Sequence, residues 1–265
     1  MAKRTFDPWK EIDYICNWIK DYFIMNGPEA KAVIGISGGK DSTIAAALLA
    51  RALGPERVIG VMMPEHVQSD IDDARKVCEY LGIRGIEIDI GPACDALYRS
   101  MDEGIDYDHK VQNTPAVSSN TPARMRMATL YAVAALVGGR VANTCNYSEN
   151  YVGYTTKFGD GAGDFALLHS YTVREVIAIG DALELPMMLV HKTPSDGLSG
   201  KTDEDNMGFT YETLDDLILD NIKPDYETYR EIQKRHDRNI HKTSCYRPPC
   251  PWPLTRRWDD EEEWF

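Results

Sequence analysis

Residues 32–48 read AVIGISGGKDSTIAAAL, and this stretch decides the fold. The apolar run 32–36 is typical of a strand that is buried on both faces. Two adjacent glycines follow it, and they allow a tight turn because no Cβ atoms stand in the way. An Ala- and Leu-rich helix is then predicted over 43–53, where a Gly-Pro pair ends it. The stretch therefore predicts a strand, a glycine-rich turn and a helix in succession.

Strands and helices continue to alternate along the chain. Further buried strands are predicted over 57–63, 86–90 and 140–144, and helices over 8–25, 69–81, 121–137, 172–182, 213–219 and 226–239. Polar or glycine-rich loops are predicted over 98–120, 153–163 and 194–205. Such alternation favours parallel strands joined by right-handed crossovers. The predicted fold class is α/β with a doubly wound parallel sheet, whose ligands bind beyond the carboxyl ends of the strands.

The composition is that of an ordinary globular protein. The 265 residues are 43% hydrophobic and 27% charged, which excludes a disordered or collagen-like chain. No apolar run approaches the ~18–20 residues of a membrane helix, and the first ten residues show no secretory signal. The 42 acidic and 29 basic residues leave a net charge of −13, which argues against a broad nucleic-acid surface. We expect a cytoplasmic protein with no nucleic-acid or membrane partner.

The glycine-rich turn Ser37-Gly-Gly-Lys-Asp-Ser42 carries the side chains of an anion site. Free amides at the start of the next helix attract anions, while the serine hydroxyls and Lys40 add donors and positive charge. Asp41 alone would repel phosphate, but Mg²⁺ binds carboxylate and phosphate oxygens together. The turn is not a Walker A motif, because Lys40 is followed by Asp rather than by Ser or Thr. These residues predict a site for a phosphate ester with Mg²⁺.

This turn resembles the PP-loop of the ATP pyrophosphatases, which bind the β,γ-pyrophosphate of ATP and release it intact. The turn indicates the superfamily but not the member. Later segments lie in the order and spacing found in NAD synthetases, at 120–127, 144–149, 153–161, 192–195, 202–204 and 241–242. From about residue 12 to residue 242 the chain is similar to the ammonia-dependent, single-domain type of this family. The resemblance implies a Rossmann-like fold of the adenine-nucleotide α-hydrolase type.

The resemblance also implies an activity. The family's enzymes are ligases that form a C–N bond by joining ammonia to the nicotinate carboxylate of deamido-NAD, and they convert ATP to AMP and pyrophosphate through an acyl-adenylate. ATP is thus the implied co-substrate, and Mg²⁺ is the implied cofactor, with Asp41 and Glu149 as its ligands. ATP contacts are implied at Gly35, Ile36, Ser37, Gly38, Gly39, Lys40, Asp41, Ser42, Thr144 and Ser195.

Contacts to deamido-NAD are implied at Arg124, Lys157, Asp164, His241 and Lys242. The amidation step has a further requirement, because ammonia is mostly protonated at neutral pH and a carboxylate nearby is a useful proton acceptor. Asp160, in the glycine-rich loop 153–163, is the predicted catalytic acceptor.

One position departs from the family pattern. Val173 stands where the family has a Lys that contacts ATP phosphate, and Arg174 is next to it. Neighbouring positions on a helix point about 100° apart, so Arg174 is not expected to replace the missing charge. Lys40 stands where many members of the family carry Gln. We predict that Lys40 supplies the phosphate charge, and we count it among the catalytic residues.

The chain is expected to divide into a synthetase-like PP-loop domain, 1–242, and a tail, 243–265, that contains Pro, Trp and acidic residues. The family forms homodimers, and helix 121–137 is a candidate for the interface, although a helix buried within one domain has the same pattern. Two other functions remain open: a tRNA-modifying PP-loop enzyme, and a nucleotide-binding module without catalysis. The net charge and the absence of a CxxC pair weigh against the first. Only the missing phosphate Lys favours the second.

Overall fold

The computed structural model describes residues 5–68, 71–105, 114–191, 202–243 and 248–256. Its strands are β1 (Lys31–Gly35), β2 (Val58–Met62), β3 (Arg84–Glu87), β4 (Gly139–Asn143) and β5 (Phe165–Ala166). The helices are α1 (Pro8–Asn26), α2 (Lys40–Leu53), α3 (Ile71–Leu81), α4 (Gly91–Gly104), α5 (Pro115–Val137), α6 (Tyr147–Val152), α7 (Val173–Ala182), α8 (Met187–Val190), α9 (Asp203–Met207), α10 (Tyr211–Asp220) and α11 (Tyr226–Thr243), with short 3₁₀ turns at Pro55–Arg57 and Leu254–Arg256.

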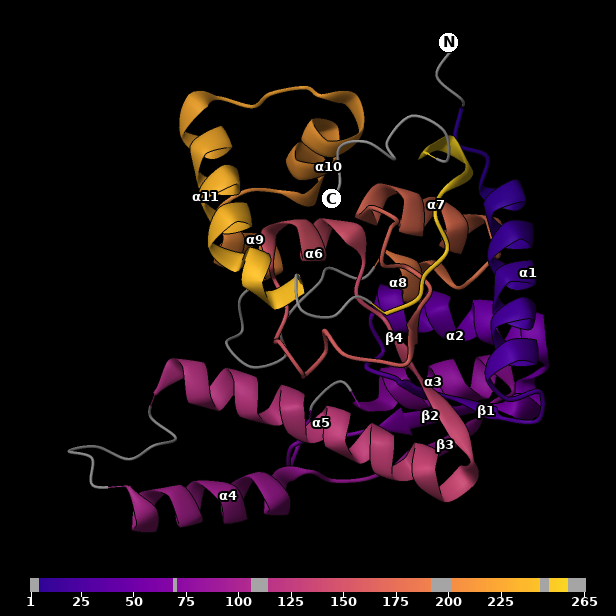
Figure 1. Ribbon diagram of the computed structural model, residues 1–265, viewed down its shortest axis with the longest axis vertical. Helices are drawn as coiled ribbons and strands as arrows, with labels where there is room; N and C mark the ends of the chain where they lie inside the picture. Colours follow the sequence, from indigo (N-terminus) through magenta and orange to yellow (C-terminus); the bar gives the residue numbers. More distant parts are fainter. Residues whose placement is uncertain (1–4, 69–70, 106–113, 192–201, 244–247, 257–265) are drawn as a thin grey trace.

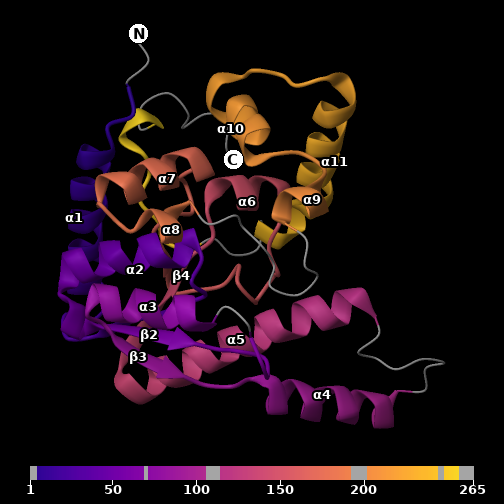
Figure 2. The same ribbon diagram turned by 180° about the vertical axis from the view of Figure 1, so that it is seen from behind.

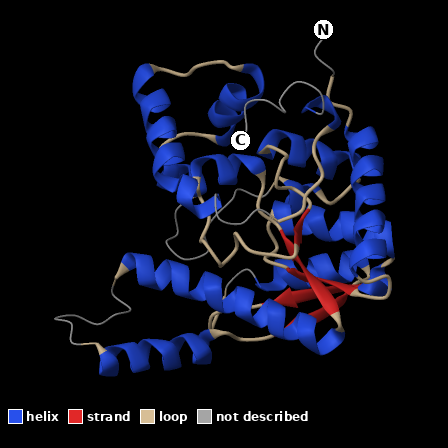
Figure 3. Ribbon diagram, in the orientation of Figure 1, coloured by secondary structure: helices blue, strands red, loops and turns tan. Residues whose placement is uncertain are grey.

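The strands form one parallel sheet in the order β3-β2-β1-β4-β5. Figure 3 shows the strands in red among the surrounding helices. The chain first builds outward from β1 through β2 to β3, and it then returns to place β4 on the other side of β1. In this register Ile34 of β1 lies beside both Gly60 of β2 and Ala142 of β4. The strand order therefore reverses between β1 and β4, which is where open α/β sheets bind their ligands. The predicted doubly wound α/β fold is confirmed.

Different helices cover the two faces of the sheet (Figures 1 and 2). Ala32 and Ile34 of β1 pack in an apolar cluster with α1, α2, α3, α7 and α8, whereas Val33 packs with α4 and α5 on the opposite face. Successive side chains of a strand point to opposite faces, so a strand covered on both sides is apolar throughout. A third apolar cluster joins α6, α9, α10 and α11 beyond the carboxyl edge of the sheet.

Most predicted elements are present, with ends shifted by a few residues. The third strand covers 84–87 rather than 86–90, although the amides of Ile88 and Ile90 still bond to the chain at the end of β2. The sequence does not predict β5, because two residues are too short to show a period. It also misses α6 and α9, within predicted loop or unassigned segments, although each begins with a capping box. No helix in the described ranges combines the length and the apolar character needed to cross a bilayer.

The prediction of a loop over 98–120 is wrong where the structure describes that segment. Helix α4 continues to Gly104, and α5 already begins at Pro115 rather than at residue 121. Pro115 lies in the first helical turn, where proline is well tolerated, whereas Pro122 lies inside the helix. An internal proline lacks an amide donor and normally ends a helix, so the sequence pattern misses the first two turns of α5.

Residues 248–256, which belong to the predicted tail, pack against the α/β body. The amide of Ala166 in β5 donates to the carbonyl of Pro249 at 2.9 Å, so this segment pairs with the outer edge of the sheet. The amide of Leu254 donates to Glu11 Oε1 at 2.9 Å. Glu11 is 1% exposed, and its Oε2 accepts from the Tyr171 hydroxyl at 2.9 Å. One buried carboxylate thus joins α1, the segment before α7 and the C-terminal segment.

Glu11→Ala should destabilise the protein by about 2–4 kcal/mol, because the buried Tyr171 hydroxyl and the partly buried Leu254 amide lose their acceptor at once. Urea unfolding followed by circular dichroism measures this difference. Glu29→Ala is the matched control: Glu29 is exposed, and its replacement should change the free energy of unfolding by less than about 0.5 kcal/mol. Equal unfolding midpoints for the two variants would contradict the role assigned to Glu11.

Candidate active site

The turn between β1 and α2 has the tight shape that the sequence predicts. Gly38 has φ of 78°, and a Cβ atom there would lie 2.9 Å from both Asp73 Cβ and Ala74 N on α3. Any other residue would be strained at Gly38 and would also collide with α3. Gly39 is the N-cap of α2 and meets no such obstacle, because the nearest heavy atom to its Cβ position is Ser37 Oγ at 3.2 Å.

The two serines of the turn bond chiefly to the turn itself. Ser42 Oγ accepts from the amide of Ser37 at 3.3 Å, lies 3.1 Å from Ser37 Oγ and donates to the Gly39 carbonyl at 3.1 Å. The Gly39 amide donates to Ser37 Oγ at 3.2 Å. These bonds hold the turn open in one shape before any ligand binds. Gly35 and Ile36 precede the turn, and the Ile36 amide continues the sheet by donating to Val61 at 2.9 Å.

Asp41 and Glu149 meet at the carboxyl edge of the sheet, although 108 positions separate them in the sequence. Asn146, the N-cap of α6, connects them. Its side-chain Nδ2 donates to Asp41 Oδ1 at 3.1 Å, and its backbone amide donates to Glu149 Oε2 at 3.1 Å. Burial, followed by the negative charge of Asp41, raises the pKa of Glu149 well above its usual range. Two carboxylates are thus held close enough to repel each other.

Lys40 is the buried cation of this site. Its side chain is 4% exposed, Nζ lies 2.9 Å from Asp41 Oδ2, and the ring centroid of Tyr211 lies 5.4 Å from Nζ. Burial alone would lower the pKa of Lys40, but the nearby charges of Asp41 and Glu149 more than offset this effect, and the net pKa is raised. Lys40 therefore stays charged, and two carboxylates share one ammonium group.

The donor set fits Mg²⁺ better than a metal that needs a cage of protein ligands. Two acids face one lysine, and ionisation of both leaves a negative charge that a cation would offset. The described part of the chain contains no group of three or more His, Cys, Asp or Glu side chains placed to hold a metal. Mg²⁺ commonly uses only one or two carboxylates and completes its shell with water and substrate phosphates. Asp41 and Glu149 are the residues that would hold it.

Four of the predicted deamido-NAD contacts lie around the loop 153–163. Arg124 Nε donates to the Lys157 carbonyl at 3.2 Å, and Lys157 Nζ donates to the His241 carbonyl at 2.9 Å. Lys242 Nζ donates to the carbonyls of Gly153 at 2.7 Å and Thr155 at 2.9 Å, and burial lowers its pKa. The loop thus brings together side chains from α5 and α11. Arg124 also lines a mainly apolar cavity of about 460 Å³ between α4 and α5.

Asp160 lies in the same loop and has an exposed side chain. Its Oδ1 accepts from the Thr156 amide at 2.9 Å, and its Oδ2 accepts from the Thr155 hydroxyl at 2.7 Å. These bonds fix the direction of the carboxylate. Its charge contributes to the raised pKa of Glu149, so Asp160 acts electrostatically on the site. Thr144 directly follows β4 at the carboxyl edge of the sheet and is partly buried.

One predicted site residue in the described ranges, Asp164, is not brought to this cluster. Asp164 lies beside the middle of β4, where its Oδ2 accepts a hydrogen bond from the Val141 amide at 2.7 Å. Its side chain thus satisfies a backbone donor of the strand. Ser195 lies outside the described residues. Arg174 also points away, as the sequence predicts: its guanidinium pairs with Asp216 and with Asp220, at 3.1 Å from the latter. Val173 is buried in the third apolar cluster.

The sequence reasoning assigns no role to Asn146, Asp203 or Tyr211, although all three belong to the site. The carboxylate of Asp203 helps to raise the pKa of Lys40, and the ring of Tyr211 contacts the Lys40 ammonium. Asn146 is the N-cap of a capping box, and Asp203 directly follows Thr202, the N-cap of another, so a pattern visible in the sequence lies at both places. No comparable signal marks Tyr211, because a tyrosine at the start of a helix is ordinary.

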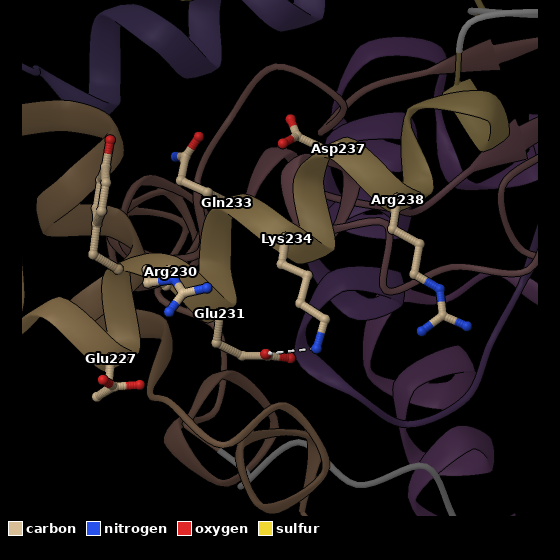
Figure 4. A pocket seen from close by; sticks show the side chains of 8 residues that line it. Glu227, Arg230, Glu231, Gln233, Lys234, Asp237 and Arg238 are labelled. Atoms are coloured by element: carbon tan, nitrogen blue, oxygen red, sulfur yellow. Dashed lines mark ion pairs between the residues drawn. The ribbon is translucent and has the colours of Figure 1, made fainter.

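Another hollow lies on α11, away from this group. Figure 4 shows its lining by residues of α11 between 227 and 238, around a cavity of about 790 Å³. Lys234 Nζ lies 3.6 Å from Glu231 Oε2 within it. Its lining carries charges of both signs and includes none of the predicted site residues, so we assign it no part in the reaction.

The sheet order, the glycine-rich turn and the paired acids define an α/β nucleotide-binding enzyme of the PP-loop class. A model of the NAD synthase family matches residues 11–246, and the chain belongs to this family. The NH(3)-dependent NAD(+) synthetase of Pyrococcus furiosus is 40% identical over 197 residues, which cover 74% of each chain.

Two solved structures resemble this fold closely. The NMN synthetase from Francisella tularensis has a TM-score of 0.82 and 35% identity, covering 92% of this chain and 99% of that one. The NH3-dependent NAD synthetase from Campylobacter jejuni has a TM-score of 0.71 and 29% identity, and the match covers 90% of this chain and 96% of that one.

The raised pKa of Glu149 predicts how stability depends on pH. Without Mg²⁺ the folded protein holds a proton on Glu149 at pH values where the unfolded chain has released it. The free energy of unfolding should therefore fall as the pH rises above about 4.3, the unperturbed pKa of Glu. Glu149→Gln removes this titration and keeps an acceptor for the capping box, so the fall should be smaller. Urea unfolding between about pH 5 and pH 8 measures both slopes.

Glu175→Gln is the control for the Glu149 variant, because Glu175 forms the same kind of capping box on α7. This control shows how much of any change comes from altering a capping box rather than from the pair of acids. A Glu149→Gln protein with an unchanged slope would show that the two acids do not interact as described.

Proposed function

We propose that this protein catalyses the ATP-dependent amidation of deamido-NAD with ammonia, giving NAD, AMP and pyrophosphate through an acyl-adenylate. Membership of the NAD synthase family supports the reaction. The observation that carries the assignment of the site is the meeting of Asp41 and Glu149 beside Lys40, at the N terminus of α2. That arrangement suits a bound polyphosphate with a divalent cation.

The first half of the reaction activates a carboxylate. An oxygen of the nicotinate carboxylate attacks the α-phosphorus of ATP, the bond from that phosphorus to the β,γ-pyrophosphate breaks, and pyrophosphate leaves. Both reactants are anionic, so the site must offset the charge that builds on the phosphates. The amides at the start of α2 and the ammonium of Lys40 do this. Mg²⁺ held by Asp41 and Glu149 would supply further positive charge to the phosphate oxygens.

The second half forms the amide. The lone pair of ammonia attacks the carbonyl carbon of the acyl-adenylate, the C–O bond to AMP breaks, and the nitrogen loses one proton. Asp160 is the acceptor in our proposal, because its carboxylate is exposed and is oriented by two hydrogen bonds. Arg124, Lys157, His241 and Lys242 would bind the dinucleotide around the same loop. The role of Asp164 as a substrate contact and that of Ser195 as an ATP contact stay predictions.

The direct test is incubation of the protein with ATP, Mg²⁺, ammonium chloride and deamido-NAD, followed by chromatography. NAD, AMP and pyrophosphate should appear in equal amounts. ATP turnover without NAD, or the appearance of ADP in place of AMP, would contradict the proposal. A nucleotide-binding module without catalysis would give no products.

A second candidate substrate is the deamido form of NMN. The similarity to the NMN synthetase from Francisella tularensis favours it, with the higher TM-score of the two structures compared above. The chemistry at the carboxylate is the same, so only the missing adenylate half distinguishes the substrates. Competition between deamido-NAD and its mononucleotide in one reaction gives the ratio of their kcat/KM values directly. We expect deamido-NAD to be preferred.

We also propose that the protein is a homodimer in the cytoplasm. Helix α5 supports the dimer, because it exposes an apolar face made of Ala128, Tyr131, Ala132, Ala135 and Leu136. Leu136 is 86% exposed. An apolar helix face of this kind is typical of an interface between subunits. Sedimentation equilibrium reports the mass, and a monomer at micromolar concentration would contradict the dimer.

Lys40→Gln should raise the KM for ATP by about tenfold, which is the loss expected from one charge-assisted hydrogen bond to phosphate. Initial rates at saturating ammonia and deamido-NAD measure this value. Arg174→Gln is the matched control, since its guanidinium pairs with Asp216 and Asp220, away from the turn. The KM of the Arg174 variant for ATP should stay unchanged. An unchanged KM in the Lys40 variant would refute the role of Lys40.

Asp160→Asn should slow amide formation by about 10²-fold or more while the acyl-adenylate still forms. Asn retains an acceptor for the Thr156 amide, so the loop should keep its shape. Exchange of labelled pyrophosphate into ATP measures the first half-reaction, and NAD production measures the whole. Normal NAD production by this variant would remove Asp160 from the mechanism.

A further inference from the structure

Tyr211 is the first residue of α10, and it reaches the glycine-rich turn from the far side of the site. Glu204 of α9 fixes the start of this helix, because its Oε1 accepts from the Tyr211 amide at 2.9 Å. The Tyr211 side chain is 4% exposed, and its ring packs in the third apolar cluster together with Val173. The position that carries a phosphate lysine in similar enzymes is thus filled by apolar packing that includes Tyr211.

The contact between Tyr211 and Lys40 is made by the face of the ring. The ring centroid lies 5.4 Å from Lys40 Nζ, which is within the range of a cation–π interaction. The Tyr211 hydroxyl is buried and has no hydrogen-bond partner among the described residues. Burial, followed by the charges of Glu149 and Asp203, raises its pKa, so it stays protonated. The polar end of Tyr211 therefore does not hold Lys40, and the ring does.

Lys40 needs such a restraint because three carboxylates attract it. Asp41 binds its ammonium at 2.9 Å, and the charges of Glu149 and Asp203 also act on it. A lysine side chain has four flexible carbons and loses much rotamer freedom when it is fixed. Without a side chain packed on one side, the Lys40 ammonium would be free to move away from the glycine-rich turn and toward Asp203 on α9. In the described structure, the ring of Tyr211 packs against Lys40 Nζ and occupies this side of the ammonium group.

We propose that Tyr211 is a positioning residue that acts through Lys40: the face of its ring holds the ammonium group beside Asp41 at the N terminus of α2, where that group meets the phosphates of ATP. This inference rests on the proposed function only in taking ATP as the ligand of the turn. It makes α10 a part of the ATP site that does not itself contact the nucleotide.

The test is a double-mutant cycle that measures ATP binding. Tyr211→Phe and Tyr211→Leu are each made in the native protein and in Lys40→Gln. Calorimetry with ATP and Mg²⁺, without deamido-NAD, gives the Kd values. Tyr211→Leu should weaken ATP binding by about tenfold, whereas Tyr211→Phe keeps the ring and should stay within about twofold of the native value. In the Lys40→Gln background the Phe and Leu variants should bind ATP equally.

Two results would overturn the proposal. Equal losses in Tyr211→Phe and Tyr211→Leu would assign the effect to the hydroxyl. A tenfold loss that persists in the Lys40→Gln background would assign it to general packing. Thermal melts check that each variant is folded. Tyr211→Met, whose longer unbranched side chain adapts better to an irregular gap, replaces the Leu variant if that protein does not fold.

Steady-state kinetics add a second readout. Loss of positioning should appear mainly in the KM for ATP, with kcat changed much less, because the reacting groups are untouched. Because the calorimetry omits deamido-NAD, it remains decisive if the protein binds ATP and makes no NAD. In that case the proposed function fails and the role of Tyr211 is still decided by the cycle.

Discussion

Asp41 and Glu149 repel each other, and the fold nevertheless holds them together. β1 and β4 are neighbours in the sheet, so the residues that follow them share its carboxyl edge. Asn146 binds both acids, and the buried ammonium of Lys40 offsets only part of their charge. The site is therefore suited to a cation that arrives with its phosphates, because the cation would offset the charge when both acids ionise.

The surroundings of the pair make this repulsion stronger. α9 carries Asp203, whose charge acts on Lys40, and α10 carries Tyr211, whose ring lies 5.4 Å from Lys40 Nζ. Removing water raises the strength of every charge interaction in the site, which matters for a reaction between two anions. The loop 153–163 carries Asp160 and Lys157, and the charge of Asp160 reaches Glu149. With the roles proposed above, activation and amidation would take place at adjoining parts of one surface.

The sequence predicts much of this arrangement because its strongest signals are local. An apolar run followed by paired glycines can form little other than a buried strand and a tight turn, so β1, α2 and the position of Asp41 follow directly. Contacts across the fold carry no such signal. Three such contacts depend on where separate elements meet: Tyr211 packs on Lys40, the Asp164 carboxylate binds the Val141 amide, and residue 249 pairs with β5. The internal Pro122 hides the start of α5, because proline rarely lies inside a helix.

Binding of Mn²⁺ in place of Mg²⁺, measured by electron paramagnetic resonance with ATP present and deamido-NAD omitted, tests the central claim most directly. We expect one bound ion per chain and an affinity for Mn²⁺ that falls at least about tenfold in Glu149→Gln, since even loss of an outer-sphere partner commonly costs that much. The same affinity in the native protein and in the Glu149 variant would contradict it.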